Sequence, residues 1–286
     1  MFSIRPLTNT GIEEIHEAFV KAFSDYVEPF RLTLPQLKHM IERRGYNPKL
    51  SFGAFSSDEL VGFTLNGIGD WNGKLTAYDT GTGIVKEFRK KGIASKMFNE
   101  SLPFLRKHKI SQYLLEVIRS NTAAFDLYKK AGFKVSREFD YYISTKAKIQ
   151  IKTGGLNKGF SIKEISNPDW DLLKTFWDFE PSWQNSIDSI NRKRNYFAIS
   201  GIYDHDDLVG YGIVEATTGD IPQLAISPEY RKIGLATALI RHLIELSEAD
   251  EIKIINIDAN HEPFKKFAQS ISLEPGFGQY EMILEL

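Results

Sequence analysis

The spacing of apolar residues along the chain predicts a regular succession of strands and helices. Between 11 and 23, apolar residues recur every three or four positions, as on one face of an amphipathic helix. In the first half we expect strands beginning at Ile4, at 51–55, at 60–66, ending near Val85, at 113–118 and at 139–144, and helices at 11–23, at 33–44, from about Gly92 and at 122–130. This alternation indicates a mixed α/β fold.

Local signals set some of the expected boundaries. Thr33 is a plausible N-cap because Gln36 follows three residues later, and Gly45 is a helix stop signal. Residues 56–59 should form the turn of a hairpin. Pro103 lies eleven residues after Gly92 in the helix expected from there and is predicted to kink or end it.

The chain contains an internal repeat. Short motifs of the first half recur in the same order in the second, beginning at Phe2 and Phe160, Leu60 and Leu208, Arg89 and Arg231, and Asn121 and Asn260. The offset between the copies shrinks from 158 to 139 residues, so the second copy is shorter. We therefore expect one domain at 1–151, a glycine-containing linker at 152–159, and a shortened domain at 160–286.

The composition narrows the functional classes. A length of 286 residues suits two domains, and a net charge of −1 gives no electrostatic reason to expect nucleic acid or an anionic membrane as a partner. With no cysteine, a thiolate metal site and a cysteine nucleophile are excluded. The sequence has no recognisable signal peptide or membrane span, and we expect a cytoplasmic monomer or homodimer.

A basic, glycine-containing loop stands at the start of the helix expected from Gly92. The backbone N–H groups of a helix N-terminus lack partners and favour an anion. Gly92 and Ala94 leave the backbone accessible, and Arg89, Lys90 and Lys91 add positive charge. The spacing fits neither a Walker loop nor a dinucleotide fingerprint, so the sequence predicts a different kind of phosphate site, repeated in the second half.

These residues resemble the GCN5-related N-acetyltransferase (GNAT) superfamily. The resemblance covers about 1–145 and 160–286, and rests on the loop segments 82–94 and 224–236 together with the block formed by 115–117, Asn121 and 124–133. Lys86 departs from the pattern, since it stands where the family often has proline. The resemblance implies two tandem acyl-CoA N-acyltransferase domains, an α/β fold with a mixed sheet, with acetyl-CoA as cofactor.

The resemblance also implies a cofactor site in the first half. A strand at 82–84 would bind the pantetheine arm, amides of 90–95 would surround the pyrophosphate, and an amide near Ile84 or Val85 would polarise the thioester carbonyl. The implied cofactor-binding residues are Thr82, Gly83, Ile84, Val85, Arg89, Lys90, Lys91, Gly92, Ile93, Ala94, Ser95, Asn121, Phe125 and Tyr128.

Two side chains are the catalytic candidates. By resemblance, Tyr128 protonates the leaving thiolate and Glu116 removes the amine proton; Asp79 is an alternative base, and loss of the proton directly to water is another. Because an acetyl-cysteine intermediate is impossible, direct transfer to a primary amine in a ternary complex is expected. The acceptor, whether small metabolite, antibiotic-like amine or peptide N-terminus, stays open.

The second half lacks both candidates. Phe267 stands where the first half has Tyr128, and Ile255 where it has Glu116. We therefore expect this half to bind acyl-CoA weakly or not at all, and to serve in packing or as a pocket wall. Two alternatives for the whole chain are a non-catalytic acyl-CoA-binding or sensing module and a structural pseudoenzyme dimer.

Overall fold

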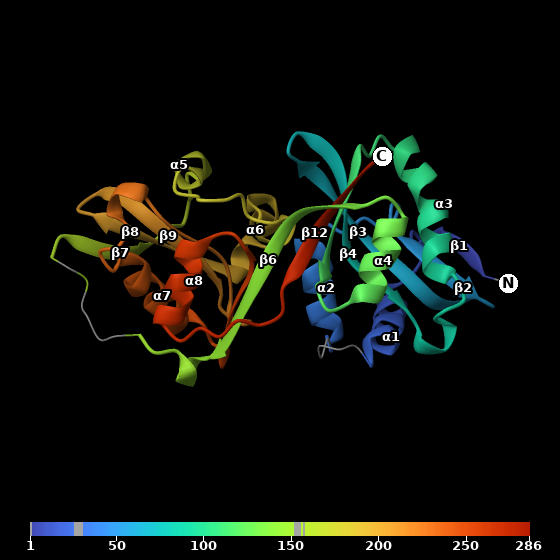
Figure 1. Cartoon of the computed structure of the whole chain (residues 1–286), viewed down its shortest axis with the longest axis horizontal. Helices are drawn as coiled ribbons and strands as arrows, with labels where there is room; N and C mark the ends of the chain where they lie inside the picture. Colours follow the sequence, from blue (N-terminus) through green and yellow to red (C-terminus); the bar gives the residue numbers. More distant parts are fainter. Residues whose placement is uncertain (1, 26–30, 152–155, 157) are drawn as a thin grey trace. The chain divides into compact units, whose positions relative to one another are not determined.

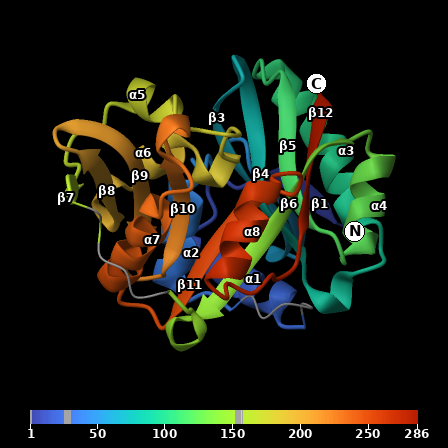
Figure 2. The ribbon, with the colours of Figure 1, turned by 60° about the vertical axis from the view of Figure 1, so that its left-hand side comes forward.

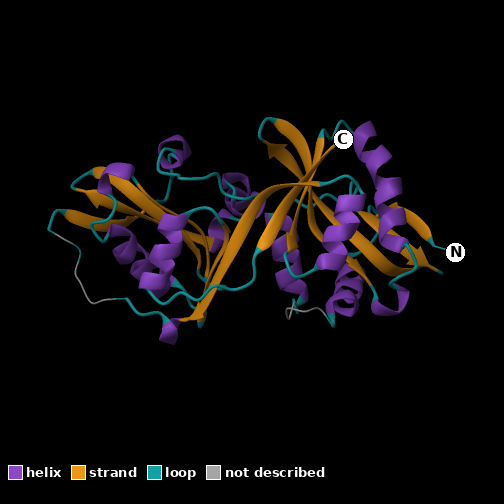
Figure 3. Cartoon of the chain, viewed as in Figure 1, coloured by secondary structure: helices purple, strands orange, loops and turns teal. Residues whose placement is uncertain are grey.

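The computed structural model describes residues 2–25, 31–151, 156 and 158–286, which form two compact units. Unit 1 comprises the described residues up to 136 together with 280–286, and unit 2 comprises those from 137 to 279. Figure 1 traces the chain through both units, and Figure 3 marks their helices and strands. Both units mix helices and strands, as the sequence predicts for an α/β fold.

Unit 1 is a sheet with helices on both faces. Its strands are β1 (Ser3–Pro6), β2 (Phe52–Ser56), β3 (Glu59–Trp71), β4 (Lys74–Ile84), β5 (Gln112–Ile118) and β12 (Gln279–Glu285), which neighbour one another in that order. Its helices are α1 (Ile12–Phe23), α2 (Leu34–Arg43), α3 (Ile93–Lys107) and α4 (Thr122–Lys130). The strands from β1 to β4 pair antiparallel, and β4 pairs parallel with β5.

Two apolar clusters show which helices cover which face of this sheet. Phe19 of α1 and Leu37 of α2 pack with Phe63 of β3 on one face. Phe98 of α3 and Tyr128 of α4 pack with strand residues on the other face, where β12 contributes to the same cluster. Because side chains of a strand alternate between faces, one sheet supports both helical layers.

The predicted helix boundaries in unit 1 are largely confirmed. Thr33 and Gln36 form a reciprocal capping box at the start of α2, and Gly45, with φ of 83°, follows its end. The expected hairpin is present, since Ser56 pairs with Glu59. Pro103 does not end its helix, because α3 continues to Lys107, and a kink at this residue stays a prediction. Proline removes one backbone donor, and the carbonyl left over belongs to the exposed residue Asn99, where water can satisfy it.

Unit 2 repeats this plan. Its strands are β7 (Phe160–Glu164), β8 (Phe197–Asp204), β9 (Asp207–Glu215), β10 (Asp220–Ile226) and β11 (Glu251–Asp258), in that order, followed by β6 (Lys134–Thr145) from Arg137 onward. Its helices are α5 (Trp170–Lys174), α6 (Ile187–Arg192), α7 (Leu235–Leu246) and α8 (Glu262–Ser270). Helix α7 and helix α8 pack with β10 and β11, and all four elements are labelled in Figure 2.

The final strand of each half belongs to the unit formed mainly by the other half. Strand β12 ends the chain and neighbours β5 in unit 1, whereas β6 pairs with β11 in unit 2 from Phe139 to Thr145. The expected domain limits, 1–151 and 160–286, follow the repeat along the sequence and stay a prediction. Of the expected linker, residues 152–155 and 157 lie outside the described residues.

The central parallel strands part in both units. In unit 1, β4 and β5 are paired from Thr76 opposite Gln112 to Asp79 opposite Leu115. In unit 2, β10 and β11 are paired at Asp220 opposite Lys253. Beyond these pairs no ladder pairing joins the described residues of the two strands in either unit, and we call this unpaired stretch the gap. In unit 1 it begins after Asp79 on β4 and after Leu115 on β5. No helix among the described residues has the length and apolarity needed to cross a membrane.

Candidate functional site

Along β4, the backbone amides and carbonyls of successive residues point alternately toward β3 and toward β5. The amide of Val85 donates to the carbonyl of Val61 on β3 at 2.9 Å, so these two residues form a hydrogen-bonded pair. In an antiparallel ladder the next pair, Ile84 opposite Gly62, turns its amide and carbonyl away from the partner strand. Of the two predicted thioester-polarising amides, Val85 is therefore occupied and Ile84 faces the gap. Thr82 has the same orientation as Ile84.

The loop before α3 has an open backbone. Lys90 and Gly92 have φ angles of 59° and 73°, and Gly92 is the N-cap of α3. A side chain added at Gly92 would meet no atom of the described chain within 4 Å of its Cβ. Ile93 is buried beneath the loop and Ser95 is exposed. The left-handed conformation turns the amides that begin α3 outward, as an anion site requires.

Arg89 contacts the protein rather than the open space above the loop. Its guanidinium donates to the carboxylate of Asp25 at 2.8 Å, to the carbonyl of Ala22 at 2.6 Å and to the carbonyl of Ile84 at 3.1 Å. Arg231 makes the same three kinds of contact in unit 2, with Asp178 and the carbonyls of Phe176 and Ile226. Arg89 thus holds the loop against the end of α1. Lys91 lies over the ring of Phe88, 5.0 Å from its centre.

Asp79 and Tyr128 are brought together where β4 and β5 part. The phenol of Tyr128 donates to Oδ2 of Asp79 at 3.4 Å, and the same oxygen accepts the hydroxyl of Thr82 at 2.7 Å. Oδ1 of Asp79 accepts the amide of Gly81 at 2.9 Å. Burial raises the pKa of Asp79 to about 6, although these hydrogen bonds oppose the shift. The structure therefore contains a carboxyl that changes charge close to neutral pH.

Glu116 lies on β5 and contacts β4 through a tyrosine. The phenol of Tyr78 donates to Oε2 of Glu116 at 3.2 Å. Burial, with the carboxylate of Glu116 beside it, raises the pKa of Tyr78 well above its ordinary value, so this phenol stays a neutral donor. Glu116 itself is half-buried. The two candidate bases therefore belong to different contacts, Asp79 with Tyr128 and Glu116 with Tyr78.

Asn121 and Phe125, at the start of α4 and within it, make contacts that fix the position of this helix. The side-chain oxygen of Asn121 caps the helix by accepting the amide of Ala124 at 3.2 Å. The ring of Phe125 lies 5.0 Å from that of Tyr280 on β12. The ring of Tyr128 is 7% exposed and meets Phe98 and Phe133 edge to face, which fixes the direction of its hydroxyl.

Several residues that support this centre have no motif in the sequence. Arg44, at the end of α2, donates to the carbonyl of Thr80 at 3.1 Å. Tyr113 donates to Asn66 at 2.6 Å, and both side chains are buried. Tyr280 comes from the far end of the chain. The Asn66 contact has no sequence signal, whereas Tyr78 directly precedes Asp79 in the sequence.

Unit 2 has apolar residues at all three proton-handling positions. Phe267 replaces Tyr128 and Ile255 replaces Glu116, as the repeat predicts. The matching strand registers, Tyr78 opposite Gly67 and Asp220 opposite Glu215, place Ile221 where unit 1 has Asp79. The loop of unit 2 is nevertheless similar, since Lys232 and Gly234 have φ angles of 62° and 92°.

Family comparison accounts for this repeated arrangement. The model of the acetyltransferase (GNAT) family matches residues 12–133 and again 160–269. The chain belongs to this family. Two matches on one chain, each with a parted pair of strands and a glycine loop, make it a tandem GNAT protein.

Curated relatives resemble only part of the chain. N-alpha-acetyltransferase 30 of Schizosaccharomyces pombe is 31% identical over 99 residues, which is 34% of this chain and 66% of that protein. N-alpha-acetyltransferase MAK3 of Arabidopsis thaliana is 29% identical over 98 residues, or 34% of this chain and 52% of that protein. The matched region thus spans between half and two thirds of these relatives.

Solved structures resemble the whole chain in fold. A tandem GNAT protein from the clavulanic acid biosynthesis pathway gives a TM-score of 0.74 at 14% identity, covering 100% of this chain and 98% of that one. A GCN5-related N-acetyltransferase from Sphaerobacter thermophilus gives 0.74 at 12% identity, covering 99% and 95%. Identities this low bear on the fold alone.

Proposed function

We propose that this GNAT protein transfers an acetyl group from acetyl-CoA to a primary amine, with the chemistry in unit 1. The observation that carries the proposal is the buried pair of Asp79 and Tyr128 beside the open backbone edge of Ile84. Unit 2 has Ile221 and Phe267 in the positions of Asp79 and Tyr128, so the two units can be compared with and without this pair. Acetyl-CoA, when bound, supplies an activated thioester carbonyl.

The residues of unit 1 fit this cofactor. The loop around Gly92 offers outward amides and a space that a Cβ would enter, which suits a diphosphate. The amides of Thr82 and Ile84 and the carbonyl of Thr82 face the gap between β4 and β5, which suits an extended arm with its own amide groups, whereas the carbonyl of Ile84 accepts from Arg89. The Ile84 amide is then the donor available to a polarised thioester oxygen. Arg89 holds the loop through Asp25.

Tyr128 is the proposed general acid. Its phenol is held by Phe98 and Phe133 and is directed toward the parted strands. A phenol, with an ordinary pKa near ~10, is protonated at neutral pH and can protonate a departing thiolate. Asp79, as acceptor of that hydroxyl, positions the phenol before transfer.

Glu116 is the proposed general base. It is half-buried on β5, beside the gap, and the phenol of Tyr78 orients one of its oxygens. Asp79 is the rival base, because a pKa of about 6 also allows it to accept a proton at neutral pH. Kinetics of Glu116→Gln and Asp79→Asn distinguish the two candidate bases, because each variant replaces one carboxylate by its amide.

The first acceptors to test are peptide N-termini. The named activity of the two curated relatives is N-alpha-acetylation, and their similarity covers about one third of this chain. An α-amino group, with an ordinary pKa of about 7.7–8.0, is easier to deprotonate at neutral pH than a lysine side chain. The lower pKa of the α-amino group supports a peptide N-terminus, rather than a lysine side chain, as the acceptor.

The test is thiol release from acetyl-CoA by the full chain in the presence of peptides with free N-termini, with N-terminally blocked peptides and lysine-containing peptides as controls. Calorimetric titration of acetyl-CoA accompanies it, with Gly92→Trp and Gly234→Trp in parallel. Amine-dependent release, with binding lost in Gly92→Trp alone, is the expected result. Absence of binding in the folded protein would exclude the proposal, and loss in Gly234→Trp alone would move the site to unit 2.

A further inference from the structure

Strand β4 contains a bulge beside the proposed proton-handling pair. In its ladder with β3, Asp79 is paired with Asn66 and Gly81 with Leu65, so β4 has one residue more than β3 between these pairs, Thr80. A bulge bends its strand and redirects the side chains next to it. Here the carboxylate of Asp79 turns back along the strand, and its Oδ1 accepts the amide of Gly81 at 2.9 Å. The conformation at Thr80 therefore sets the position of this carboxylate.

Arg44 contacts the bulge from the end of α2. Its Nη1 donates to the carbonyl of Thr80 at 3.1 Å and to the hydroxyl of the same residue at 3.4 Å. The backbone of Arg44 is itself fixed, because its amide donates to the carbonyl of Met40 at 3.1 Å and a Cβ added at Gly67 of β3 would collide with its carbonyl oxygen. A hydrogen bond from a charged donor is stronger than one between neutral groups. The contact with Thr80 therefore restrains the bulge from a fixed point.

This restraint acts on the pair from the opposite side of the sheet. Helix α2 ends at Arg43 and packs with α1 on one face, whereas Tyr128 belongs to α4 on the other face. Arg44 holds Thr80, and the preceding residue, Asp79, accepts the hydroxyl of Tyr128. A shift of the bulge would therefore move the acceptor of that hydroxyl.

The guanidinium of Arg44 also brings a positive charge to this buried centre. Burial raises the pKa of Asp79 to about 6, and the charge of Arg44 opposes the shift together with three hydrogen bonds to the carboxylate. Burial also raises the pKa of Tyr78, and Arg44 opposes this shift as well. Groups that interact with Asp79 from the strands and from α4 include three phenols, those of Tyr78, Tyr113 and Tyr128. The charge that favours the carboxylate form comes from Arg44.

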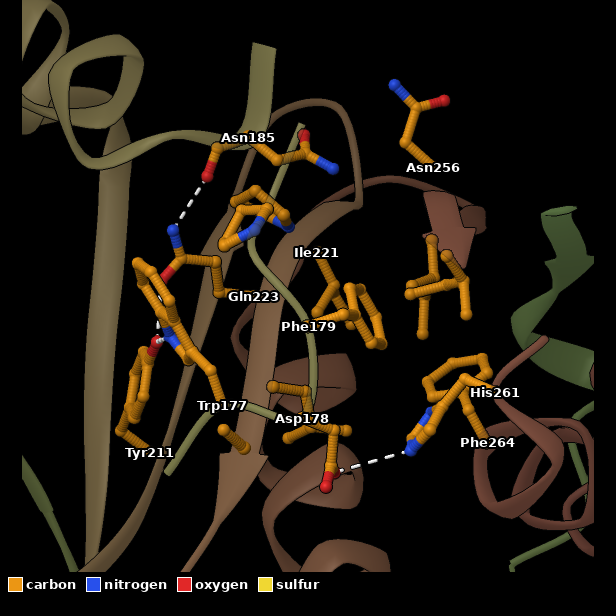
Figure 4. A pocket seen from close by; sticks show the side chains of 16 residues that line it. Trp177, Asp178, Phe179, Asn185, Tyr211, Ile221, Gln223, Asn256, His261 and Phe264 are labelled. Carbon is orange, nitrogen blue, oxygen red and sulfur yellow. Dashed lines mark hydrogen bonds and ion pairs between the residues drawn. The ribbon is translucent and has the colours of Figure 1, made fainter. Parts of the chain in front are cut away.

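The matching bulge of unit 2 is held by an amide. Between Asp220 and Gln223, β10 again has one residue more than β9. The side chain of Gln223 donates to the carbonyl of Asn185 at 2.6 Å, drawn as a dashed line in Figure 4. Ile221 stands here in the place of Asp79, so this bulge presents no carboxylate. The bulge thus belongs to the fold of both units, and a cation holds it in the unit where a carboxylate depends on it.

We propose that Arg44 is a positioning residue for acetyl transfer in unit 1, which holds the bulge so that the carboxylate of Asp79 meets the hydroxyl of Tyr128. The inference rests on the proposed function, because that function assigns protonation of the thiolate to Tyr128. Arg44 acts through the backbone of Thr80 and through its charge.

Titration of the Asp79 carboxyl tests the contact without any reaction. Carbon-13 NMR of the full chain, labelled at its aspartate carboxyl carbons, follows this group, and Asp79→Asn assigns its signal. In Arg44→Gln the midpoint should move above the wild-type value, because loss of a nearby cation disfavours the carboxylate. Lys38→Gln removes a charge from an exposed position of α2 and should leave the midpoint unchanged. A midpoint that stays the same in Arg44→Gln would contradict the inference.

The pH profile of kcat tests the positioning role. In Arg44→Gln we expect kcat at neutral pH to fall roughly 10- to 100-fold, and the decline of kcat on the acid side to begin at higher pH, in step with the carboxyl midpoint. The Kd of acetyl-CoA should change little. A variant that only destabilised the fold would lower the active fraction without moving the acid-side decline. If both kcat and this decline match the wild type, the proposal is wrong.

Arg44→Lys keeps the test decisive if Arg44→Gln fails to fold. Lysine keeps the charge but cannot reproduce the reach and planar geometry of the guanidinium. The midpoint of Asp79 should therefore stay near the wild-type value while kcat is reduced, and a kcat equal to that of the wild type would remove the positioning role. Absence of transfer by the wild type, with the Asp79 midpoint still moved by Arg44→Gln, would exclude the proposed function while supporting the hold of Arg44 on the bulge.

Discussion

The phenol oxygen of Tyr128 lies 3.4 Å from Oδ2 of Asp79, at a point where both side chains are buried. The contact joins α4 to β4, and the two residues lie 49 positions apart in the sequence. The pKa of Asp79 is raised to about 6 there because burial disfavours its charge. The protonation state of Asp79 therefore determines whether the phenol of Tyr128 faces a carboxylate or a neutral carboxyl group.

Replacement of Tyr128 by phenylalanine should lower kcat about 10²-fold, because a general acid is lost while the ring packing against Phe98 is kept. The Kd of acetyl-CoA should change little. Steady-state kinetics and calorimetry on the same preparation check both values. Full retention of kcat would remove Tyr128 from the chemistry.

Replacement of Asp79 by asparagine should abolish one pH dependence of the reaction. In the wild type, protonation of Asp79 below about pH 6 turns an acceptor of the Tyr128 hydroxyl into a donor, so kcat should fall. The ratio of wild-type to variant kcat should decline below pH 6, and titration of the amine cancels in this ratio. A ratio that stays constant from pH 5 to 8 would contradict the role.

The same carboxyl should affect stability with a defined sign. Its pKa of about 6 in the folded chain exceeds the ordinary value near ~3.9, so the folded state holds the proton more tightly. The resulting stabilisation is complete below about pH 4 and is lost as the pH rises through 6, a change of about 3 kcal/mol. Urea unfolding at pH 4.5 and 7.5 should show that wild type loses more free energy of unfolding than Asp79→Asn over this range.

Replacement of Glu116 by glutamine tests the assigned base. Glutamine can still accept the hydroxyl of Tyr78, so the fold should be kept, while kcat should fall by about 10²–10⁴. Glu100→Gln, at an exposed position of α3, is the matched control. If Glu116→Gln is active and Asp79→Asn is not, the base is Asp79.

Two glycine substitutions separate binding from folding. Gly92→Ala should cost about 1–2 kcal/mol of stability because φ is 73°, yet its Cβ meets no atom within 4 Å. In Gly67→Ala the Cβ would lie 2.0 Å from the backbone oxygen of Arg44, so the loss of stability should be larger. Only Gly92→Ala should weaken acetyl-CoA binding beyond its effect on folding. Urea unfolding and calorimetry on both variants decide this.

Much of the fold is predictable because its signals are local. The apolar spacing of α1, the capping box of Thr33 and the glycine loop each occupy a few neighbouring residues. The turn between β3 and β4, Asn72-Gly73, with φ angles of 55° and 72°, is a strong hairpin signal of the same kind. Pro103 does not end α3, because the carbonyl of Asn99 that loses its donor is exposed and water can satisfy it.

The site is only partly predictable because its contacts are long-range. Tyr128 and Glu116 follow from motif positions, but the contact of Tyr128 with Asp79 and the shift in the pKa of Asp79 depend on burial that no local pattern encodes. The contacts of Arg89 with Asp25 and two carbonyls are also long-range and have no local signal, and its part in cofactor binding stays a prediction.

The place of β12 has a consequence for synthesis of the chain. Its neighbour β5 ends at Ile118, whereas β12 begins at Gln279. At roughly 5–20 residues per second, a ribosome needs about 10–30 s to make the chain between them. During that time the edge of β5 lacks its native neighbour, and an unpaired edge is a template for another chain. Neighbouring nascent chains on one messenger therefore have an opportunity to exchange this strand.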